Sequence, residues 1–293
     1  MSKNVLVTGG CGFIGSHVVD ALIKKKYKVT IFDLVPPGRK DVKFIKGNIL
    51  NRSLVQSSLK NMHFIFHLAA VSDINKVEKI PIKTIETNIL GTAYLLEASR
   101  KANIERFIFA GSVYSYSTAG NIYTTSKTSS ELIIKNYELL YGQRFTILRY
   151  TTVYGPRNRE ADALSIFVDR ARKNLDLIIH GDGQQKRNYI YVKDLAEGSM
   201  IGLKKKAENK VFTLASNKNI KIIELAKMII KLTNSRSKIL FNQKKKRVDD
   251  FSSKYSYSKT ENVPIKWIPK YDIKSGLKEY MRTLYDWAIR VSL

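Results

Sequence analysis

Three polar residues in the stretch GSVYSYSTAGNIYTTSK, which spans 111–127, have the types that proton transfer requires: Ser112, Tyr123 and Lys127. Tyr123 and Lys127 are four positions apart, so on a helix they lie on one face. A free tyrosine has a pKa of about 10 and is a poor base at neutral pH, but a nearby ammonium favours its phenolate form. The pattern therefore predicts a tyrosine base supported by a lysine, with the serine as a third member.

A glycine-rich turn, TGGCGFIGSH, follows the first strand-like run and opens the first helical one. Gly9, Gly12 and Gly15 are three apart, which lets the backbone approach a pyrophosphate at a helix N-terminus. Asp33 ends the second strand-like run, where a carboxylate can bond an adenosine ribose and would repel a 2′-phosphate. These residues predict a dinucleotide site and favour NAD over NADP. Cys11, inside the turn, receives no catalytic role.

Strand-like and helical patterns alternate in the first half of the chain. Apolar, β-branched runs indicate buried strands, and apolar residues at helical spacing indicate the helices between them. Such strands are expected at 4–8, 28–33, 106–112 and 144–150, and long helices at 82–103 and 123–142. The alternation predicts an α/β fold of the Rossmann type, a doubly wound parallel sheet with helices on both faces.

The alternation loosens after Tyr150, where a Gly-Pro loop interrupts it. Helices are expected at about 161–173, 221–232 and 272–289, with short strands between them. We therefore expect an NAD-binding Rossmann domain over 1–150, to which part of 181–205 returns. A smaller C-terminal α/β substrate domain is expected over 151–293.

Composition limits the class of protein. The 293 residues, 44% of them hydrophobic, are enough for one large or two smaller domains with a full core. No run of the sequence is long and apolar enough to span a membrane, and the N-terminus lacks the pattern of a secretory signal. The single cysteine excludes an internal disulfide. We expect a cytoplasmic protein.

The formal net charge of +26 has two interpretations. One is binding to nucleic acid or an anionic membrane surface. The other is a lysine-rich composition combined with an anionic small substrate. Lysines occur along the whole chain, without one basic block interleaved with aromatic residues, which favours the second interpretation. We expect no nucleic-acid partner and no membrane insertion.

Several motifs occur together in a specific order. They are TGGCGFIGSH, Asp33, HLAA (67–70), TNILGT (87–92), YTTSK and RYTTVYGPR (149–157), followed by the segments 181–198 and 247–263. In this order and spacing the chain resembles the extended short-chain dehydrogenase/reductases. Within that group it is similar to the NAD-dependent nucleotide-sugar epimerases and dehydratases of the UDP-glucose 4-epimerase type. The resemblance covers nearly the whole chain and implies NAD as cofactor, a nucleotide-diphosphate sugar as substrate, and a homodimer formed through the helices near 82–103 and 123–142.

The resemblance implies a role for each matching residue. Tyr123 takes a proton from a sugar hydroxyl as hydride passes to NAD, Lys127 holds the nicotinamide ribose and tunes the tyrosine, and Ser112 shares the sugar hydroxyl. Because the connection between Ser112 and Tyr123 is short, Ser115 and Ser117 are alternatives. The implied cofactor-binding set is Gly9, Gly12, Phe13, Ile14, Gly15, Asp33, Asn48, Ile49, Leu68, Ala69, Ala70, Tyr123, Lys127 and Tyr150. The implied substrate-binding set is Ser112, Thr152, Arg187, Arg247 and Asp250.

Some positions depart from the family pattern. Asn48 stands where the family often has an aspartate that binds adenine, and Thr152 stands where relatives usually have an asparagine that touches the diphosphate. The base of the substrate therefore need not be uracil. Arg247 lies beside three lysines, so a solvated basic run is an alternative to diphosphate binding. His180 is interpreted as a loop residue, and the four histidines and one cysteine predict no metal site.

The expected reaction is reversible oxidation at carbon 4 of the sugar, ending in epimerisation. A 4-dehydrogenase or 4-keto reductase is the alternative, and a non-catalytic NAD- or RNA-binding relative is disfavoured by the intact Tyr123–Lys127 pair. Relatives that remove water carry Asp-Glu or Glu directly after the catalytic Ser or Thr. Here Val113 and Tyr114 follow Ser112, and the next carboxylate is Glu131.

Overall fold

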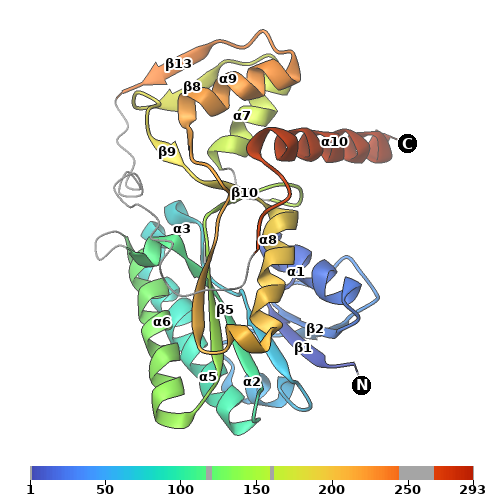
Figure 1. Ribbon diagram of the computed structural model, residues 1–293, viewed down its shortest axis with the longest axis vertical. Coiled ribbons are helices and arrows are strands. Elements are labelled where there is room, and N and C mark those ends of the chain that lie inside the picture. The colour runs from blue at the N-terminus through green and yellow to red at the C-terminus, as the bar shows by residue number, and fades with distance from the viewer. Residues whose placement is uncertain (1, 117–120, 159–161, 244–266, 293) are drawn as a thin grey trace. The chain divides into compact units, whose positions relative to one another are not determined.

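The computed structural model contains a seven-stranded parallel sheet (Figure 1). All of its strands except β11 come from residues 1–150. Its strand order is β11-β6-β5-β4-β1-β2-β3. The strands are β1 (Asn4–Thr8), β2 (Lys28–Asp33), β3 (Lys43–Lys46), β4 (Phe64–His67), β5 (Arg106–Ser112), β6 (Phe145–Tyr150) and β11 (Lys210–Leu214). The structure describes residues 2–116, 121–158, 162–243 and 267–292. The predicted doubly wound α/β fold is confirmed.

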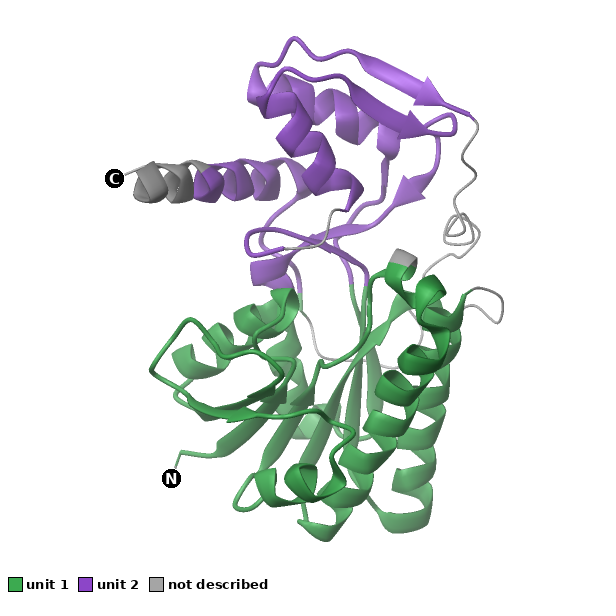
Figure 2. Cartoon of the chain, turned by 180° about the vertical axis from the view of Figure 1, so that it is seen from behind, with its two compact units in different colours: residues 1–150, 196–214, 257–267 green, residues 151–195, 215–256, 268–293 purple. Residues whose placement is uncertain are grey.

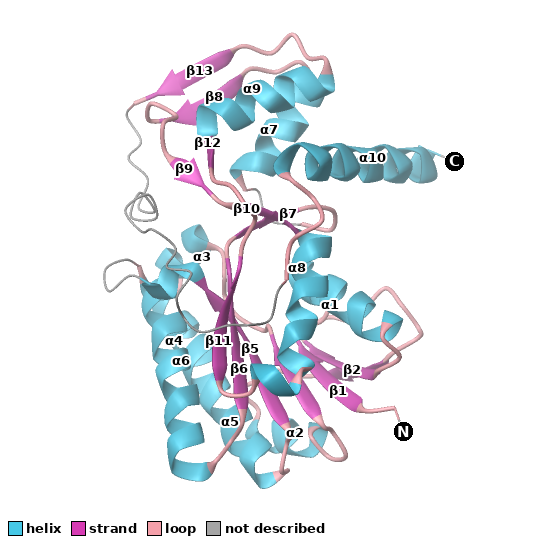
Figure 3. Cartoon of the chain, viewed as in Figure 1, coloured by secondary structure: helices cyan, strands magenta, loops and turns pink. Residues whose placement is uncertain are grey.

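Helices pack on both faces of this sheet (Figure 3). They are α1 (Phe13–Lys24), α2 (Arg52–Ser58), α3 (Ile74–Lys79), α4 (Pro81–Ile85), α5 (Gly91–Lys101), α6 (Ile122–Tyr141), α8 (Val192–Ser199) and the 3₁₀ helices η2 (Val113–Tyr116), η3 (Met200–Leu203) and η4 (Lys205–Ala207). Leu95 of α5 and Ile134 of α6 share one core with Phe107 of β5. On the opposite face Gly202 of η3 lies against Ile108.

The buried strands follow directly from their sequences. All six residues of β6, FTILRY, are buried, and so are four of the five residues of β1, NVLVT. Strands of a parallel sheet are covered on both faces, so they are apolar throughout rather than alternating. Helix α6 begins where the side chain of Asn121 accepts a hydrogen bond from the Thr124 amide at 3.0 Å, and it ends at Gly142 with φ +66°.

The long helix expected over 82–103 is not one regular α-helix. A π-helical turn, η1 (Glu86–Leu90), separates α4 from α5. At this turn the Asn88 carbonyl accepts hydrogen bonds from the hydroxyls of Thr92 at 2.6 Å and Ser130 at 2.9 Å. In an uninterrupted α-helix this carbonyl would accept a hydrogen bond from a backbone amide of the helix. Here side-chain hydroxyls donate to it. Turns of this kind occur frequently at functional sites.

The chain divides into two compact units (Figure 2). The described part of unit 1 lies within Met1–Tyr150 and Ala196–Leu214 and includes Trp267, whereas unit 2 begins at Thr151. The segment 196–214 also belongs to unit 1, so 196–205 is the part of the expected 181–205 that lies in this unit, and the segment continues to Leu214. It contributes β11, which extends the sheet beyond β6.

The described residues of unit 2 form short strands and helices. The strands form the pairs β7 (Thr152–Tyr154) with β10 (Tyr189–Tyr191), β9 (Lys186–Arg187) with β12 (Ile220–Lys221), and β8 (Leu177–His180) with β13 (Ile239–Asn242). The helices are α7 (Ala163–Arg172), α9 (Ile222–Thr233) and α10 (Ile273–Ser292). Its core includes Leu164, Phe167, Leu225 and Leu277. Among the described helices of both units, none combines the length and apolar character of a membrane span.

Candidate active site

The glycine turn brings three backbone segments together without side chains. Gly9 has φ +72°, and a Cβ there would lie 2.7 Å from the Ala69 nitrogen. A Cβ at Gly15 would lie 2.0 Å from the Gly9 carbonyl oxygen, so only glycine allows this approach. Helix α1 starts directly after Gly12 and has no side-chain cap, so its first N–H groups are available to an anion. The turn therefore fits the pyrophosphate of a dinucleotide.

Asp33, at the end of β2, is held against this turn. Its Oδ2 accepts a hydrogen bond from the Cys11 amide at 2.9 Å, and its Oδ1 accepts one from the Val35 amide at 3.3 Å. The first cation after Asp33 in the sequence, Arg39, is bonded to Asp41 and Asp20, which raise the pKa of its guanidinium. A carboxylate beside the turn and an arginine already paired favour a ribose hydroxyl over a 2′-phosphate.

The remaining residues of the predicted cofactor set occupy the same unit. Phe13 and Ile14 open α1, and Leu68, Ala69 and Ala70 follow β4. Asn48 is exposed after β3, with Ile49 buried beside Gly91. Tyr150 is buried at the end of β6, where its hydroxyl is 2.9 Å from the Ser199 hydroxyl and burial raises its pKa. The carboxyl ends of neighbouring parallel strands thus carry this set, as in other open α/β folds.

Lys127 and Tyr123 lie on one face of α6. The Lys127 ammonium donates a hydrogen bond to the Ala110 carbonyl at 2.8 Å and lies 5.9 Å from the centre of the Tyr123 ring. Lys127 is only 5% exposed, and this burial lowers its pKa to about 8, whereas the charge of Glu131 acts to raise it. The predicted pair is therefore assembled in the folded chain, with its cation held in place by the end of β5.

Ser112 ends β5 next to the same pair. Its hydroxyl accepts a hydrogen bond from the Tyr114 amide at 3.3 Å, and the Tyr114 ring contacts the Tyr123 ring edge to face, with centres 6.2 Å apart. Ser115, one of the two alternatives, has a buried hydroxyl without a hydrogen-bond partner among the described residues. Ser117 lies outside the described residues. Ser112 and Ser115 therefore both remain candidates.

A buried histidine connects β1, β4 and α5. His67 Nδ1 is 2.8 Å from the Thr8 hydroxyl and Nε2 is 2.9 Å from the Thr92 hydroxyl. The Thr92 hydroxyl gives its only proton to the Asn88 carbonyl, so it accepts from Nε2–H, and Nδ1 accepts from Thr8. Burial, with a contribution from the Lys127 charge, lowers the pKa of His67 to about 3. The ring is therefore neutral at physiological pH and has a fixed orientation.

Asn88 links the segment after β4 to α6. Its amide nitrogen donates to the Val71 carbonyl and to the Ser126 hydroxyl, both at 3.0 Å, and its amide oxygen accepts from the Val71 amide at 2.8 Å. The Ser126 hydroxyl donates to the Tyr123 carbonyl at 2.8 Å. Sequence reasoning used HLAA and TNILGT only as family motifs and assigned no role to His67 or Asn88. The available signal was a polar residue inside an apolar pattern, of a strand for His67 and of a helix for Asn88.

The predicted substrate residues of unit 2 are only partly described. Thr152 begins β7, and its amide donates to the Asn188 carbonyl at 3.1 Å. Arg187 is 8% exposed and donates to the Lys186 carbonyl at 3.2 Å. Arg247 and Asp250 lie outside the described residues. Their proposed contacts with a diphosphate and a ribose stay predictions.

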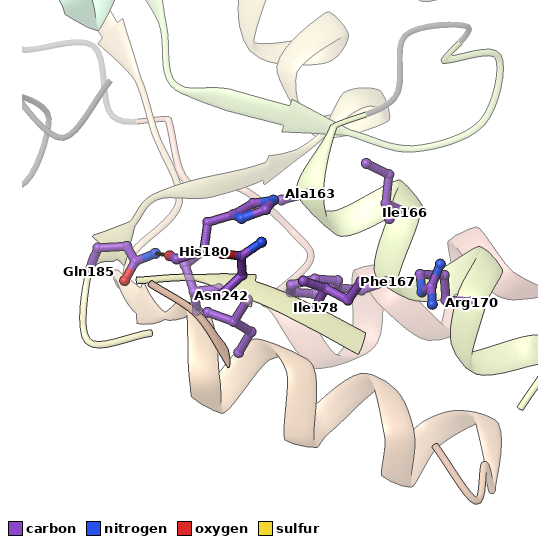
Figure 4. Close-up of a pocket in the computed structure, with 10 residues that line it drawn as sticks. Ala163, Ile166, Phe167, Arg170, Ile178, His180, Gln185 and Asn242 are labelled. Atoms are coloured by element: carbon purple, nitrogen blue, oxygen red, sulfur yellow. Dashed lines mark hydrogen bonds between the residues drawn. The ribbon is translucent and has the colours of Figure 1, made fainter. Parts of the chain in front are cut away.

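A pocket of about 250 Å³ in unit 2 is shown in Figure 4. Its walls are mainly apolar, and its polar groups come from Arg170, His180, Gln185 and Asn242. His180 is the last residue of β8 rather than a loop residue, because β13 pairs with β8 as far as this position. Its Nδ1 is buried and has no hydrogen-bond partner among the described residues. A buried ring nitrogen of this kind is suited to a polar group of a ligand.

The fold and the site define a class of protein. A glycine turn at the switch between β1 and β4, an acid after β2, and a Tyr–Lys pair after β5 are the parts of a dinucleotide-dependent oxidoreductase. The NAD dependent epimerase/dehydratase family matches residues 5–215, and the chain belongs to this family. It is an NAD-dependent enzyme. Within the described residues, no three His, Cys, Asp or Glu side chains are grouped to hold a metal ion.

Relatives by sequence carry different activities in their names. A putative UDP-glucose 4-epimerase of Methanocaldococcus jannaschii is 33% identical over 94% of this chain and 96% of its own length. A UDP-N-acetyl-alpha-D-glucosaminuronate decarboxylase of Bacillus cytotoxicus is 32% identical over 82% of this chain and 83% of its own. The mouse dTDP-D-glucose 4,6-dehydratase is 26% identical over 98% of this chain and 91% of its own.

Solved structures share the architecture along nearly the whole chain. The UDP-glucose 4-epimerase of Thermotoga maritima, solved with UDP-glucose, has a TM-score of 0.82 at 28% identity and covers 97% of this chain and 100% of its own. The UDP-glucuronic acid 4-epimerase of Bacillus cereus, solved with UDP-glucuronic acid and NAD, has a TM-score of 0.81 at 25% identity with the same coverage.

Gly15→Ala should weaken NAD binding by about tenfold or more, a change of about 1.4 kcal/mol. The new Cβ would meet the Gly9 carbonyl oxygen at 2.0 Å, so the turn must open and its N–H groups lose their alignment. Isothermal titration of NAD into protein stripped of nucleotide measures the change, and thermal unfolding confirms that the variant folds.

Gly38→Ala is the matched control, because nothing lies within 4 Å of a Cβ at Gly38. It should bind NAD as the natural protein does, and NADP should bind the natural protein more weakly than NAD because of Asp33. Unchanged NAD binding by folded Gly15→Ala would contradict the assignment of the pyrophosphate to this turn.

Proposed function

We propose that the protein catalyses reversible NAD-dependent oxidation at carbon 4 of a nucleotide-diphosphate sugar, most simply as a 4-epimerase. The observation that carries this proposal is the buried Lys127 ammonium beside the Tyr123 ring, next to the end of β5. The alternative in the same class is a 4-dehydrogenase or 4-keto reductase, in which the hydride is not returned to the same sugar. The names of the relatives support the substrate class.

The proposed chemistry needs one proton relay. NAD bound at the glycine turn would supply the acceptor and donor of hydride at carbon 4. The Tyr123 phenolate takes the proton of the sugar 4-hydroxyl, and Lys127 stabilises that phenolate through its positive charge. Ser112, or Ser115 in its place, holds the same hydroxyl. On return of the hydride, Tyr123 gives the proton back to the 4-keto oxygen.

The surroundings of this relay favour a reaction limited to carbon 4. Dehydration across carbons 5 and 6 would need a further acid and base. Val113 and Tyr114 follow Ser112, and Glu131, the next carboxylate in the sequence, forms a buried ion pair with Arg149 at 2.7 Å. A carboxylate held in this way is not available to exchange protons with a sugar. Epimerisation and net oxidation or reduction at carbon 4 need neither group.

The nucleotide part of the substrate is assigned to unit 2. The pocket shown in Figure 4 has apolar walls that suit the faces of a base and polar groups that suit its edge. His180 Nδ1 and Gln185, whose amide nitrogen donates to the His180 carbonyl at 3.2 Å, are the candidates for base recognition. Thr152, Arg187 and Arg247 are proposed to contact the diphosphate, and Asp250 is proposed to contact the ribose.

A homodimer is the proposed assembly, in the cytoplasm. Helix α6 exposes Leu132, Leu139 and Leu140 at 57%, 77% and 67%, although its opposite face is buried. Ile82 in α4 is 68% exposed. Exposed apolar residues repeated along one helix are typical of a surface covered by a partner. The same helices mediate pairing in the family that the sequence resembles.

Tyr123→Phe should lower turnover by about 10²–10⁴, because the ring stays but the proton acceptor is lost. NAD affinity should be nearly unchanged, since the glycine turn and Asp33 are intact. Steady-state rates with the substrate found by screening nucleotide sugars, and titration of NAD, measure the two effects. Turnover at the natural rate would show that the tyrosine is not the base.

Ser112→Ala and Ser115→Ala serve as paired controls for this assignment. If Ser112 holds the sugar hydroxyl, its substitution should reduce turnover by a factor within the range expected for Tyr123→Phe, and Ser115→Ala should have little effect. The reverse order would transfer the role to Ser115. Equal, small effects of both would remove the serine from the proposed relay.

Incubation with candidate nucleotide sugars in deuterated water tests the restriction to carbon 4. NMR and mass spectrometry should show a product altered only at carbon 4, without deuterium at carbon 3 or 5. Net oxidation would be distinguished from epimerisation by stoichiometric accumulation of NADH. A product lighter by one water, or by carbon dioxide, would place the enzyme with its dehydratase or decarboxylase relatives instead.

Sedimentation equilibrium should give about twice the chain mass of 33.5 kDa. Leu139→Lys places a charge in the middle of the proposed interface and should shift the protein toward the monomer. Leu240→Lys, in unit 2 and 47% exposed, is the matched control and should leave the mass unchanged. A natural protein that sediments as a monomer would rule out the dimer.

A further inference from the structure

A buried ion pair lies beside the proton relay. Arg149 Nη2 donates to Glu131 Oε2 at 2.7 Å, and Arg149 Nε lies 3.1–3.2 Å from both carboxylate oxygens. The side chains are 7% and 4% exposed. Taking two charges out of water is unfavourable, and a buried pair is weak evidence for a contribution to stability. The pair therefore invites an explanation other than stability.

The pair is in contact with the end of β5. Arg149 is opposite Gly111 in the β5–β6 register, and a Cβ at Gly111 would lie 2.8 Å from Glu131 Oε1. The residue before Gly111 is Ala110, whose carbonyl accepts the hydrogen bond of Lys127, and the residue after it is Ser112. Lys127 and Glu131 are one turn apart on α6. They thus contact consecutive residues at the end of β5.

The segment after Ser112 covers the ion pair. The Tyr116 ring lies over the Arg149 guanidinium, whose Cζ is 4.4 Å from the centre of the ring. The Tyr116 hydroxyl is 2.5 Å from the Thr213 hydroxyl of β11. An arginine under an aromatic ring is stabilised by the ring electrons, and the cover reduces contact with water. The ion pair therefore links α6, β5, β6 and η2, the elements that carry the proposed relay.

Glu131 also sets the charge around Lys127. Burial lowers the pKa of Lys127 to about 8, and the Glu131 carboxylate opposes this effect. The other titratable or charged groups are Tyr123 on α6, Tyr114 and Tyr116 on η2, Arg149 on β6, and the neutral His67 on β4. None of these supplies a second carboxylate. Without Glu131, the buried ammonium would lose a proton more readily.

We propose that Glu131 is a positioning residue for the proton relay: its ion pair with Arg149 fixes α6 to the end of β5, and its charge keeps Lys127 in the ammonium form. This inference rests on the proposed role of Tyr123 and Lys127. It concerns a residue that does not itself touch the sugar or the cofactor. Its effect reaches the reaction through Lys127 and through the placement of Ser112.

The test is the pH–rate profile of Glu131→Gln. Loss of a nearby negative charge makes each deprotonation of the coupled Tyr123–Lys127 pair easier, so both limbs of the profile should move to lower pH, by about one unit. Glu138→Gln, seven residues later on α6 and bonded to Asn209, is the matched control and should leave both limbs in place. Glu131→Asp keeps the negative charge, so both limbs of its pH–rate profile should lie at the pH of the natural protein.

Glu131→Gln removes the carboxylate that forms the buried ion pair with Arg149 and can destabilise the fold. If it fails to fold, the double variant Glu131→Gln/Arg149→Met removes both charges and should fold, with a smaller shift in the same direction. The inference is overturned if a variant that folds and binds NAD has both limbs of its pH–rate profile at the same pH as the natural protein. The ion pair would then have a structural role only. Failure of the proposed function itself is distinguished by Tyr123→Phe, which would then keep natural turnover.

Discussion

The burial of the Lys127 ammonium is the constraint on which the arrangement of the site depends. A cation that is 5% exposed needs polar partners, and these come from the Ala110 carbonyl and the charge of Glu131. The neighbouring histidine, His67, is kept neutral by its own burial and by hydroxyl partners, so it adds no second positive charge. The site thus places the Lys127 ammonium beside Tyr123.

A second constraint is the close approach of two backbone segments at the carboxyl ends of β1 and β4. Gly9 packs on the backbone of Ala69, so β1 and β4, neighbours in the sheet, come close at their carboxyl ends. Thr8, the residue before Gly9, bonds to His67, and Asn88 ties the segment after β4 to α6. The glycine turn and the Tyr123–Lys127 pair are therefore parts of one continuous hydrogen-bonded arrangement within unit 1.

The sequence predicted what local pattern controls. The strands at 4–8, 28–33 and 106–112 have the predicted bounds, because buried parallel strands have mainly apolar sequences. The π turn within 82–103 could not be predicted, since one extra residue per turn barely alters the apolar spacing. The partners of His67 and Glu131 were equally hidden: Thr8 is 59 residues from His67, and such pairs arise only from tertiary packing. Because the connection between Ser112 and Tyr123 is short, Ser115 stays an alternative to Ser112 as the residue that holds the sugar hydroxyl.

The charges around the relay also bear on which chemistry the site can support. A tyrosine beside a buried ammonium can exchange one proton with one hydroxyl, and a hydride acceptor completes that step. Elimination of water or inversion at a second carbon would need another group free to titrate near the sugar. Among the described residues of unit 1, His67 is held neutral between Thr8 and Thr92, and Glu131 is bound to Arg149. The sequence between Ser112 and Glu131 contains no carboxylate, and this supports the proposal of a reaction at a single carbon.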